Sequence, residues 1–303
     1  MRRLPSAIAT ALVLAASTSA CSSTGDTASP AASACPDEPI QIIVSVDQWG
    51  DIVESLAGAC ADVTTVITGT SVDPHDYEPT TADIAKFTDA ELVVVNGADY
   101  DPWALKAVAT LPNKPPIVDA AEVVGVKDGA NPHIWYGPDF VVEVAAAVNK
   151  ELTQLLPKSA TYLNDQDRKW QEEMKPYRDE IARIKAGATG RSYGATESVF
   201  DYMAEAVGLQ NVTPQGYQNA SAAESDPSPG DLNAFENALK EKKMDVLVYN
   251  TQTEGSIPEQ INATAKSAGV PVVNVTESVP SQDASFEGWQ VSQLRDLATA
   301  LGL

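Results

Sequence analysis

Two histidines are the most informative residues for chemistry, because the 303-residue chain contains no others and both stand in the same setting. His75 follows Pro74, and His133 follows Pro132. A proline fixes its own φ at about −65° and removes a backbone donor, so each imidazole should project from a stiff loop. Imidazole is the commonest protein metal ligand, and a ligand benefits from a preset direction. We interpret the pair as metal ligands; two surface histidines beside turn prolines are the simpler alternative.

Two glutamates in the second half of the chain occupy positions that also suit a metal. Glu197 and Glu277 each follow a β-rich apolar run, and Glu197 stands just before a predicted helix. In parallel α/β sheets, ligands collect outside the carboxyl ends of the strands. A glutamate there also suits a helix start, where the helix dipole favours negative charge. Spacing alone does not select these glutamates over the acids that flank His75.

The first 20 residues are typical of an export signal. Arg2 and Arg3 form a charged start, residues 7–16 form an apolar run, and small residues precede Cys21. The apolar run is too short to span a bilayer. Small residues that end in cysteine are similar to the cleavage box of bacterial lipoproteins, which would make Cys21 the acylated N-terminus. Thr18 departs from that box, which usually has leucine at this position.

The segment that follows the leader has a composition that cannot bury a core. Residues 21–35 are mostly Ser, Thr, Ala, Gly, Asp and Pro, which predicts a flexible tether. The other two cysteines, Cys35 and Cys60, bracket the first predicted strand and helix. Because an exported protein permits disulfides, we predict a bond between them; two buried free thiols are the alternative.

The charge of the chain excludes one class of partner. The sequence has 20 basic and 42 acidic side chains, for a formal net charge of −22. A nucleic acid requires a positive field on the protein, so nucleic-acid binding is not expected. A negative field favours cations but ordinarily serves solubility.

Alternating β-rich and helical patterns predict the fold class. The predicted strands are Gln41–Val46, Val63–Thr68, Glu91–Asn96 and Pro116–Asp119 in the first half, and Arg191–Ala195, Asn211–Pro214, Asp245–Tyr249 and Pro271–Val275 in the second. The predicted helices between them are Gln48–Ala59, Thr81–Phe87, Pro102–Leu111, Ser198–Val207, Pro229–Glu241 and Pro258–Ala268. Such alternation indicates parallel sheets with helices on both faces.

One amphipathic stretch joins the two halves. Residues 159–186 carry apolar side chains at three-to-four spacing, which predicts a helix, and Pro176 should kink or locally break it. The predicted fold is therefore α/β, with an N-terminal lobe over residues 36–158 and a C-terminal lobe over 187–303. Each lobe is expected to hold a parallel four-stranded sheet flanked by helices, and one long rigid helix joins them.

Three motifs in order resemble the zinc/manganese substrate-binding lipoproteins of ABC importers. They are DPHDYEP at Asp73–Pro79, DAELVVVNG at Asp89–Gly97 and NPHIW at Asn131–Trp135. The similarity covers nearly the whole mature chain and includes ESDPSPGDL at Glu224–Leu232. The resemblance implies two α/β lobes joined by a rigid helix, with the metal between the lobes.

The resemblance also implies a ligand set. The histidines of the two Pro-His motifs fall on His75 and His133. The third ligand of the family, usually histidine and sometimes glutamate, falls on Glu197, and the fourth, an acid after the last strand, falls on Glu277. The His-rich loop of many zinc members has no counterpart here. The implied protein is a monomer outside the cytoplasm, anchored to the membrane by its N-terminal lipid, and its partner is an ABC importer permease.

The chemistry of this ligand set bears on which metal is carried. Two imidazoles and two carboxylates give a neutral site with a divalent ion, and the carboxylates supply an oxygen-rich set that suits Mn²⁺ better than tetrahedral Zn²⁺. The Irving–Williams order instead favours Zn²⁺, and Fe²⁺ is also compatible. Asp76, Glu78, Tyr77 and Trp135 are interpreted as groups that orient the ligands or pack nearby, and Trp135 as a core aromatic.

Two other functions compete with transport. An exported metallohydrolase would need an open coordination position and a general base, and the sequence has neither a Gly-x-Ser-x-Gly nor a His-Glu-x-x-His pattern. An enzyme is therefore not expected. A metal-dependent surface adhesin is the second alternative, and the sequence shows no long apolar patch that would favour it.

Overall fold

The computed structural model describes residues 34–70, 77–223, 225–253, 255–280 and 285–303. Residues 34–303 form one compact unit. Within the described part of the chain, no helix combines the length and apolar character that crossing a membrane requires. The predicted signal peptide, most of the predicted tether and Cys21 lie outside the described residues.

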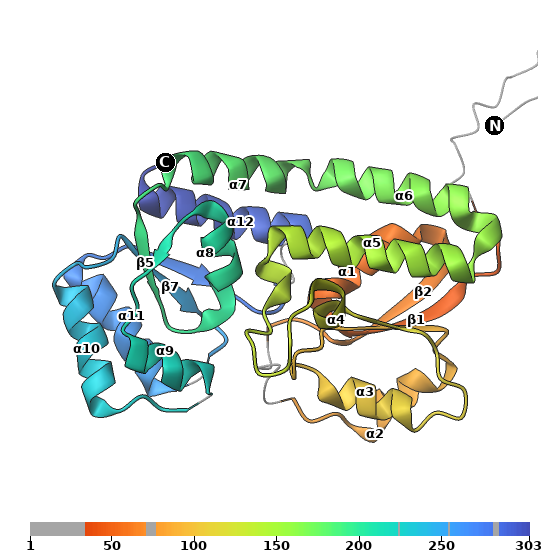
Figure 1. Ribbon diagram of the computed structural model, residues 1–303, viewed down its shortest axis with the longest axis horizontal. Coiled ribbons are helices and arrows are strands. Elements are labelled where there is room, and N and C mark those ends of the chain that lie inside the picture. The colour runs from red at the N-terminus through yellow and green to blue at the C-terminus, as the bar shows by residue number, and fades with distance from the viewer. Residues whose placement is uncertain (1–33, 71–76, 224, 254, 281–284) are drawn as a thin grey trace, which may run out of the picture. The chain divides into compact units, whose positions relative to one another are not determined.

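The first lobe is built on a parallel four-stranded sheet. The strands β1 (Ile40–Val46), β2 (Ala61–Ile67), β3 (Leu92–Val95) and β4 (Ile117–Asp119) lie in the order β2-β1-β3-β4. The flanking helices are α1 (Asp47–Ala57), α2 (Thr81–Lys86), α3 (Pro102–Ala109), α4 (Ala120–Val124) and α5 (Pro138–Leu155). Figure 1 shows α1 and α5 on one side of the sheet and α2 and α3 on the other. All four residues of β3 are buried, as expected for a parallel strand covered on both faces.

The second lobe repeats this arrangement. Its parallel strands β5 (Ser192–Ala195), β6 (Gln210–Asn211), β7 (Val246–Asn250) and β8 (Val272–Val275) lie in the order β6-β5-β7-β8. Its helices are α8 (Asp201–Val207), α9 (Gln215–Ala222), α10 (Pro229–Lys240), α11 (Ser256–Ala268) and α12 (Phe286–Leu301). Counted from the first strand of each lobe, the two sheets have the same strand order. The predicted fold, two α/β lobes with parallel four-stranded sheets, is confirmed.

Two helices in line join the lobes. The helix α6 (Ala160–Glu173) ends at Met174, and α7 (Lys175–Gly187) begins directly after it. Pro176 lies in the first turn of α7, where its missing N–H breaks no helical hydrogen bond. The predicted local break at this proline is confirmed. Figure 1 shows α6 above α5 of the first lobe and α7 above α12 of the second.

The helices α5 and α12 are not among those predicted from the sequence, although both carry helical patterns. In α5 the buried residues are Val141, Val144, Ala145, Val148 and Leu152, at three-to-four spacing. The helix α12 packs against α7, α1 and β8, so it contacts both lobes. One continuous apolar core includes residues of both lobes, and a separate cluster lies between α10, α11 and β7.

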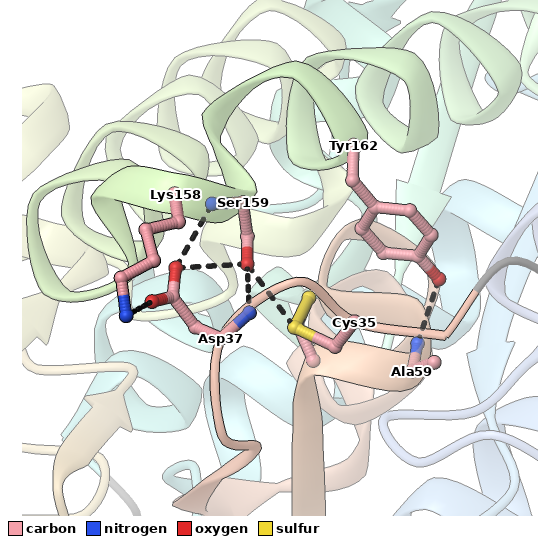
Figure 2. Close-up of a disulfide and its surroundings, with 7 residues drawn as sticks. Cys35, Asp37, Ala59, Lys158, Ser159 and Tyr162 are labelled. Carbon is pink, nitrogen blue, oxygen red and sulfur yellow. Dashed lines mark hydrogen bonds and ion pairs between the residues drawn. A yellow bond between two sulfur atoms is a disulfide. The ribbon is translucent and has the colours of Figure 1, made fainter.

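The N-terminal end of the described chain is fixed to the joining helices. Cys35 and Cys60 form a disulfide across a sequence separation of 25, which confirms the predicted pairing. Figure 2 shows that Asp37 lies beside this bond and accepts hydrogen bonds from the backbone N–H and the hydroxyl of Ser159, both at 2.9 Å. The backbone N–H of Ala59 donates to the Tyr162 hydroxyl at 2.8 Å.

We predict that loss of the Cys35–Cys60 bond lowers the free energy of unfolding by about 3 kcal/mol, because the unfolded chain regains the entropy of an open loop. Urea unfolding of the Cys35→Ala/Cys60→Ala double variant measures this difference, and reductant should leave the variant unchanged. Equal unfolding midpoints for the wild type with and without reductant would contradict the prediction.

Candidate metal centre

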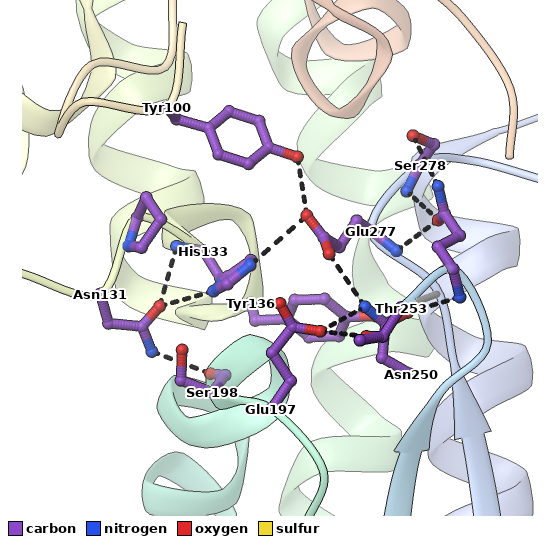
Figure 3. A network of polar contacts seen from close by, with 12 residues as sticks. Tyr100, Asn131, His133, Tyr136, Glu197, Ser198, Asn250, Thr253, Glu277 and Ser278 are labelled. Atoms are coloured by element: carbon purple, nitrogen blue, oxygen red, sulfur yellow. Dashed lines mark hydrogen bonds and ion pairs between the residues drawn. The ribbon is translucent and has the colours of Figure 1, made fainter. Parts of the chain in front are cut away.

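Two of the candidate ligands follow the carboxyl ends of strands in the second lobe. Glu197 comes two residues after β5, Glu277 comes two residues after β8, and His133 lies in the segment between α4 and α5. His75, the other predicted ligand, lies outside the described residues. Figure 3 shows the imidazole of His133 from the first lobe directed at the two carboxylates of the second.

Three of the four predicted ligands come together. One ligand atom each from His133, Glu197 and Glu277 can be chosen so that all three lie within 4.8 Å of one another. The Nε2 atom of His133 is 3.5 Å from Oε2 of Glu277. His133 and Glu277 are 2% and 0% exposed, and Glu197 is half-buried. Two carboxylates held this close and this deep need compensating positive charge, which a divalent cation supplies.

The orientation of His133 is fixed by an amide. The Oδ1 atom of Asn131 lies 2.7 Å from Nδ1 of His133, and Nδ2 of the same amide donates to the carbonyl of Ser198 at 2.8 Å. Because the amide oxygen can only accept, the contact favours the neutral tautomer with its proton on Nδ1, in which the Nε2 lone pair faces the cluster. The acids that we expected to orient a ligand, Asp76 and Glu78, stand beside His75 in the sequence. For His133 the orienting group is the amide of Asn131.

Asn250 links the two carboxylates and was not predicted as a site residue. Its Nδ2 donates to Oε2 of Glu197 at 2.8 Å and to Oε1 of Glu277 at 2.9 Å (Figure 3). The Thr253 hydroxyl also donates to Oε2 of Glu197. Asn250 is the last residue of β7, so a polar side chain at the carboxyl end of a buried strand was the available signal.

Both lobes hold Glu277. From the second lobe, Oε1 of Gln252 accepts from the backbone N–H groups of Glu277 and Ser278, at 2.7 and 2.9 Å. From the first lobe, Gln48 Nε2 donates to the backbone carbonyl of Glu277 at 2.8 Å, and the Tyr100 hydroxyl donates to its Oε2 at 3.0 Å. We call the interface where Gln48, Tyr100 and His133 of the first lobe face Glu277 of the second the seam. Contacts across this seam set the position of the Glu277 carboxylate.

Acidic side chains of α1 extend this seam. Asp47 accepts from the backbone N–H groups of Gly69 at 2.6 Å and Val279 at 3.3 Å, and Asp51 accepts from that of Phe286 at 2.8 Å. Burial raises the pKa of the Asp47 carboxyl to about 6, against the lowering effect of these two donors. Asp47 thus connects the chain near the predicted His75 loop to the chain just after Glu277.

The other residues named from the sequence have plainer roles. Trp135 is fully buried and its ring centroid lies 5.0 Å from that of Tyr100, in agreement with its interpretation as a core aromatic. Tyr77 packs against Trp103 with centroids 5.3 Å apart, and Glu78 is exposed. Asp76 lies outside the described residues.

The architecture and site agree with comparisons to known proteins. The model of the ZnuA family, described as "Zinc-uptake complex component A periplasmic", matches residues 42–300. The chain belongs to this family. The resemblance expected from the sequence motifs is thereby confirmed, and so is the predicted class of transport proteins.

The individual proteins that this chain resembles are distant from it in sequence. "Iron-binding protein YfeA" of Yersinia pestis is 26% identical over 223 residues, which cover 70% of each chain. "Manganese-binding lipoprotein MntA" of Halalkalibacterium halodurans is 25% identical over 235 residues, covering 72% of this chain and 73% of MntA. The solved structure of the SBP FpvC from Pseudomonas aeruginosa with Ni²⁺ shares the fold, with a TM-score of 0.72 at 19% identity over 88% of this chain and 97% of FpvC.

The raised pKa of Asp47 predicts a specific dependence of stability on pH. Its folded pKa of about 6 lies above the ordinary value of 3.8, so the folded state binds this proton more tightly than the unfolded state does. The protonated Asp47 carboxyl therefore contributes to the free energy of unfolding, fully below pH 3.8, and this contribution is lost as the pH rises through about 6. Its full size is up to about 3 kcal/mol.

We therefore expect Asp47→Asn, which resembles the protonated acid, to gain stability relative to the wild type as the pH rises from 4 to 7. Urea unfolding of both proteins across this range gives the difference. Asp226→Asn, at an exposed position, is the control and should show no such trend. If the difference in unfolding free energy between the wild type and Asp47→Asn stays constant with pH, the raised pKa of Asp47 is refuted.

Proposed function

We propose that this protein captures a divalent transition metal outside the cytoplasm and delivers it to the permease of an ABC importer. The observation that carries this proposal is the convergence of His133, Glu197 and Glu277 at the seam between two lobes. Membership of the ZnuA family supports the transport role. We propose His75 as the fourth ligand, on the basis of its Pro-His motif. The metal is the transported ligand.

The proposed physiological metal is Mn²⁺. Two carboxylates present up to about four oxygen atoms beside the imidazoles, and hard ions of higher coordination number prefer such sets to the tetrahedral nitrogen and sulfur sites of Zn²⁺. The relatives YfeA and MntA are named for iron and manganese binding. Zn²⁺ should still bind well, as the Irving–Williams order requires. Metal content of the protein purified from its native envelope, with competition titrations of Mn²⁺, Zn²⁺ and Fe²⁺, tests the choice.

We propose further that the protein is a monomeric lipoprotein of the cell membrane, with Cys21 as its acylated N-terminus. The leader and the small residues before Cys21 support this. The disulfide and the Asp37–Ser159 hydrogen bonds give the described chain a fixed starting point next to α6. The alternatives considered from the sequence, a metallohydrolase and an adhesin, are not proposed, because the matched family is a transport family.

Alanine at any of the three clustered ligands should weaken metal binding strongly. Loss of a group that merely orients a ligand costs about 10–100-fold in affinity, so loss of His133, Glu197 or Glu277 itself should cost more than about 100-fold for Mn²⁺. Calorimetric titration measures this. The matched control is Glu172→Ala, which removes the same charge from an exposed position on α6. Near-native affinity in Glu197→Ala or Glu277→Ala would show that the second lobe binds the metal elsewhere.

The proposed anchor predicts a definite mass. The envelope form should begin at Cys21 and carry a lipid increment, which intact mass spectrometry detects. Cys21→Ala should release the protein from the membrane fraction, because a chain without acyl groups has no apolar anchor. An envelope form that starts at another residue, or that lacks lipid, would refute the anchor.

A further inference from the structure

The hydroxyl of Tyr100 reaches across the seam to a proposed metal ligand. Tyr100 lies in the loop after β3 of the first lobe, and its hydroxyl is 3.0 Å from Oε2 of Glu277 in the second. Gln48 Nε2 lies 3.3 Å from the phenol oxygen. Because an amide NH₂ group only donates, the phenol oxygen accepts from Gln48 and its own proton is directed at Glu277. The direction of the Tyr100 hydrogen bond is therefore fixed by its neighbours.

The loop that carries Tyr100 has a strained backbone conformation. Ala98 and Asp99 adopt φ values of 52° and 62°, in the left-handed region that non-glycine residues rarely occupy. The buried carboxylate of Asp101 accepts from the backbone N–H groups of Asn96 at 2.7 Å and Gly97 at 2.9 Å. Such strain persists where the surrounding structure over-determines it, which occurs mainly at functional sites. Asp101 thus holds the loop in the shape that brings Tyr100 to the seam.

The ring of Tyr100 is equally constrained. Tyr100 is 4% exposed, and its ring centroid lies 5.0 Å from that of Trp135 and 6.2 Å from that of His133. A phenylalanine at this position would keep these contacts and lose the hydroxyl alone. The packing function of the residue and its hydrogen bond to Glu277 can therefore be separated by experiment.

We propose that Tyr100 is a positioning residue that holds the Glu277 carboxylate for the metal and sets the rate at which the metal leaves. This inference rests on the proposed function. A carboxylate oxygen has two lone pairs, so Oε2 can accept from Tyr100 with one and bind an ion with the other. From the second lobe, Asn250 likewise donates to the other oxygen of Glu277, Oε1. Without the phenol, one oxygen of Glu277 loses the donor that ties it to the first lobe, and the bound ion is released faster.

Tyr100→Phe tests the proposal, with Tyr162→Phe as the matched control. The control also removes one phenol hydroxyl that forms a hydrogen bond, to the N–H of Ala59 beside α6. Three readouts are needed: the Kd for Mn²⁺, the dissociation rate into excess chelator, and the visible absorption spectrum of bound Co²⁺. Tyr100→Phe should raise the Kd by about 10–100-fold, mainly through faster dissociation, and should change the Co²⁺ spectrum. Tyr162→Phe should change none of these three.

A second variant keeps the test decisive if Tyr100→Phe folds poorly. Gln48→Met removes the donor to both the phenol oxygen and the Glu277 carbonyl, and should raise the Kd in the same direction. Because Gln48 contacts both the Tyr100 hydroxyl and the backbone of Glu277, the effects of the two substitutions should not add in the double variant. Unfolding midpoints without metal show whether a variant has merely lost structure.

The outcomes separate the two proposals. If the wild type binds Mn²⁺ and both Tyr100→Phe and Gln48→Met bind and release it as the wild type does, with an unchanged Co²⁺ spectrum, the role of Tyr100 is overturned and the proposed function stands. If the wild type binds none of Mn²⁺, Zn²⁺ and Co²⁺, the proposed function is overturned, and the role of Tyr100 with it.

Discussion

The structure depends on keeping two carboxylates of one lobe close together in a largely buried place. Glu197 and Glu277 repel each other at short range, and burial deprives them of the water that would screen this repulsion. The amide of Asn250 offsets part of the cost by donating one N–H to each carboxylate. A divalent cation between them and His133 would offset the rest. The site is thus prepared for positive charge before any ion arrives, which is the property that a capture protein requires.

The seam between the lobes gives this arrangement its rigidity. Tyr136 of the first lobe has its ring centroid 5.4 Å from that of Phe200 and 5.8 Å from that of Trp289, both of the second. Its hydroxyl also donates to the carbonyl of Thr276, next to Glu277, at 2.7 Å. Aromatic packing and hydrogen bonds to the backbone therefore support the same short segment. A ligand held in this way loses little conformational entropy when it binds an ion.

The sequence could predict the features that depend on local pattern. Apolar runs located the strands, although the predicted strand Asn211–Pro214 shares only Asn211 with β6. The strands placed Glu197 and Glu277 at carboxyl ends, and Pro176 located the break between the joining helices. Asn250 and Tyr100 could not be found in this way, because their roles arise from side chains that meet only across strands or lobes. Motif resemblance, rather than spacing, chose the two glutamates over other acids. The helix α12 has a helical pattern in the sequence, but its contact with both lobes arises only from tertiary packing.

We propose that one metal ion is bound between the lobes by His133, Glu197 and Glu277 together with His75. The most direct test is a crystal structure of the Mn²⁺-loaded protein with anomalous diffraction recorded on both sides of the manganese absorption edge. We expect one strong anomalous peak, with Nε2 of His133 and at least one oxygen of each glutamate within about 2.5 Å of it. A peak elsewhere on the protein, or one coordinated by the histidines without either glutamate, would contradict this ligand set.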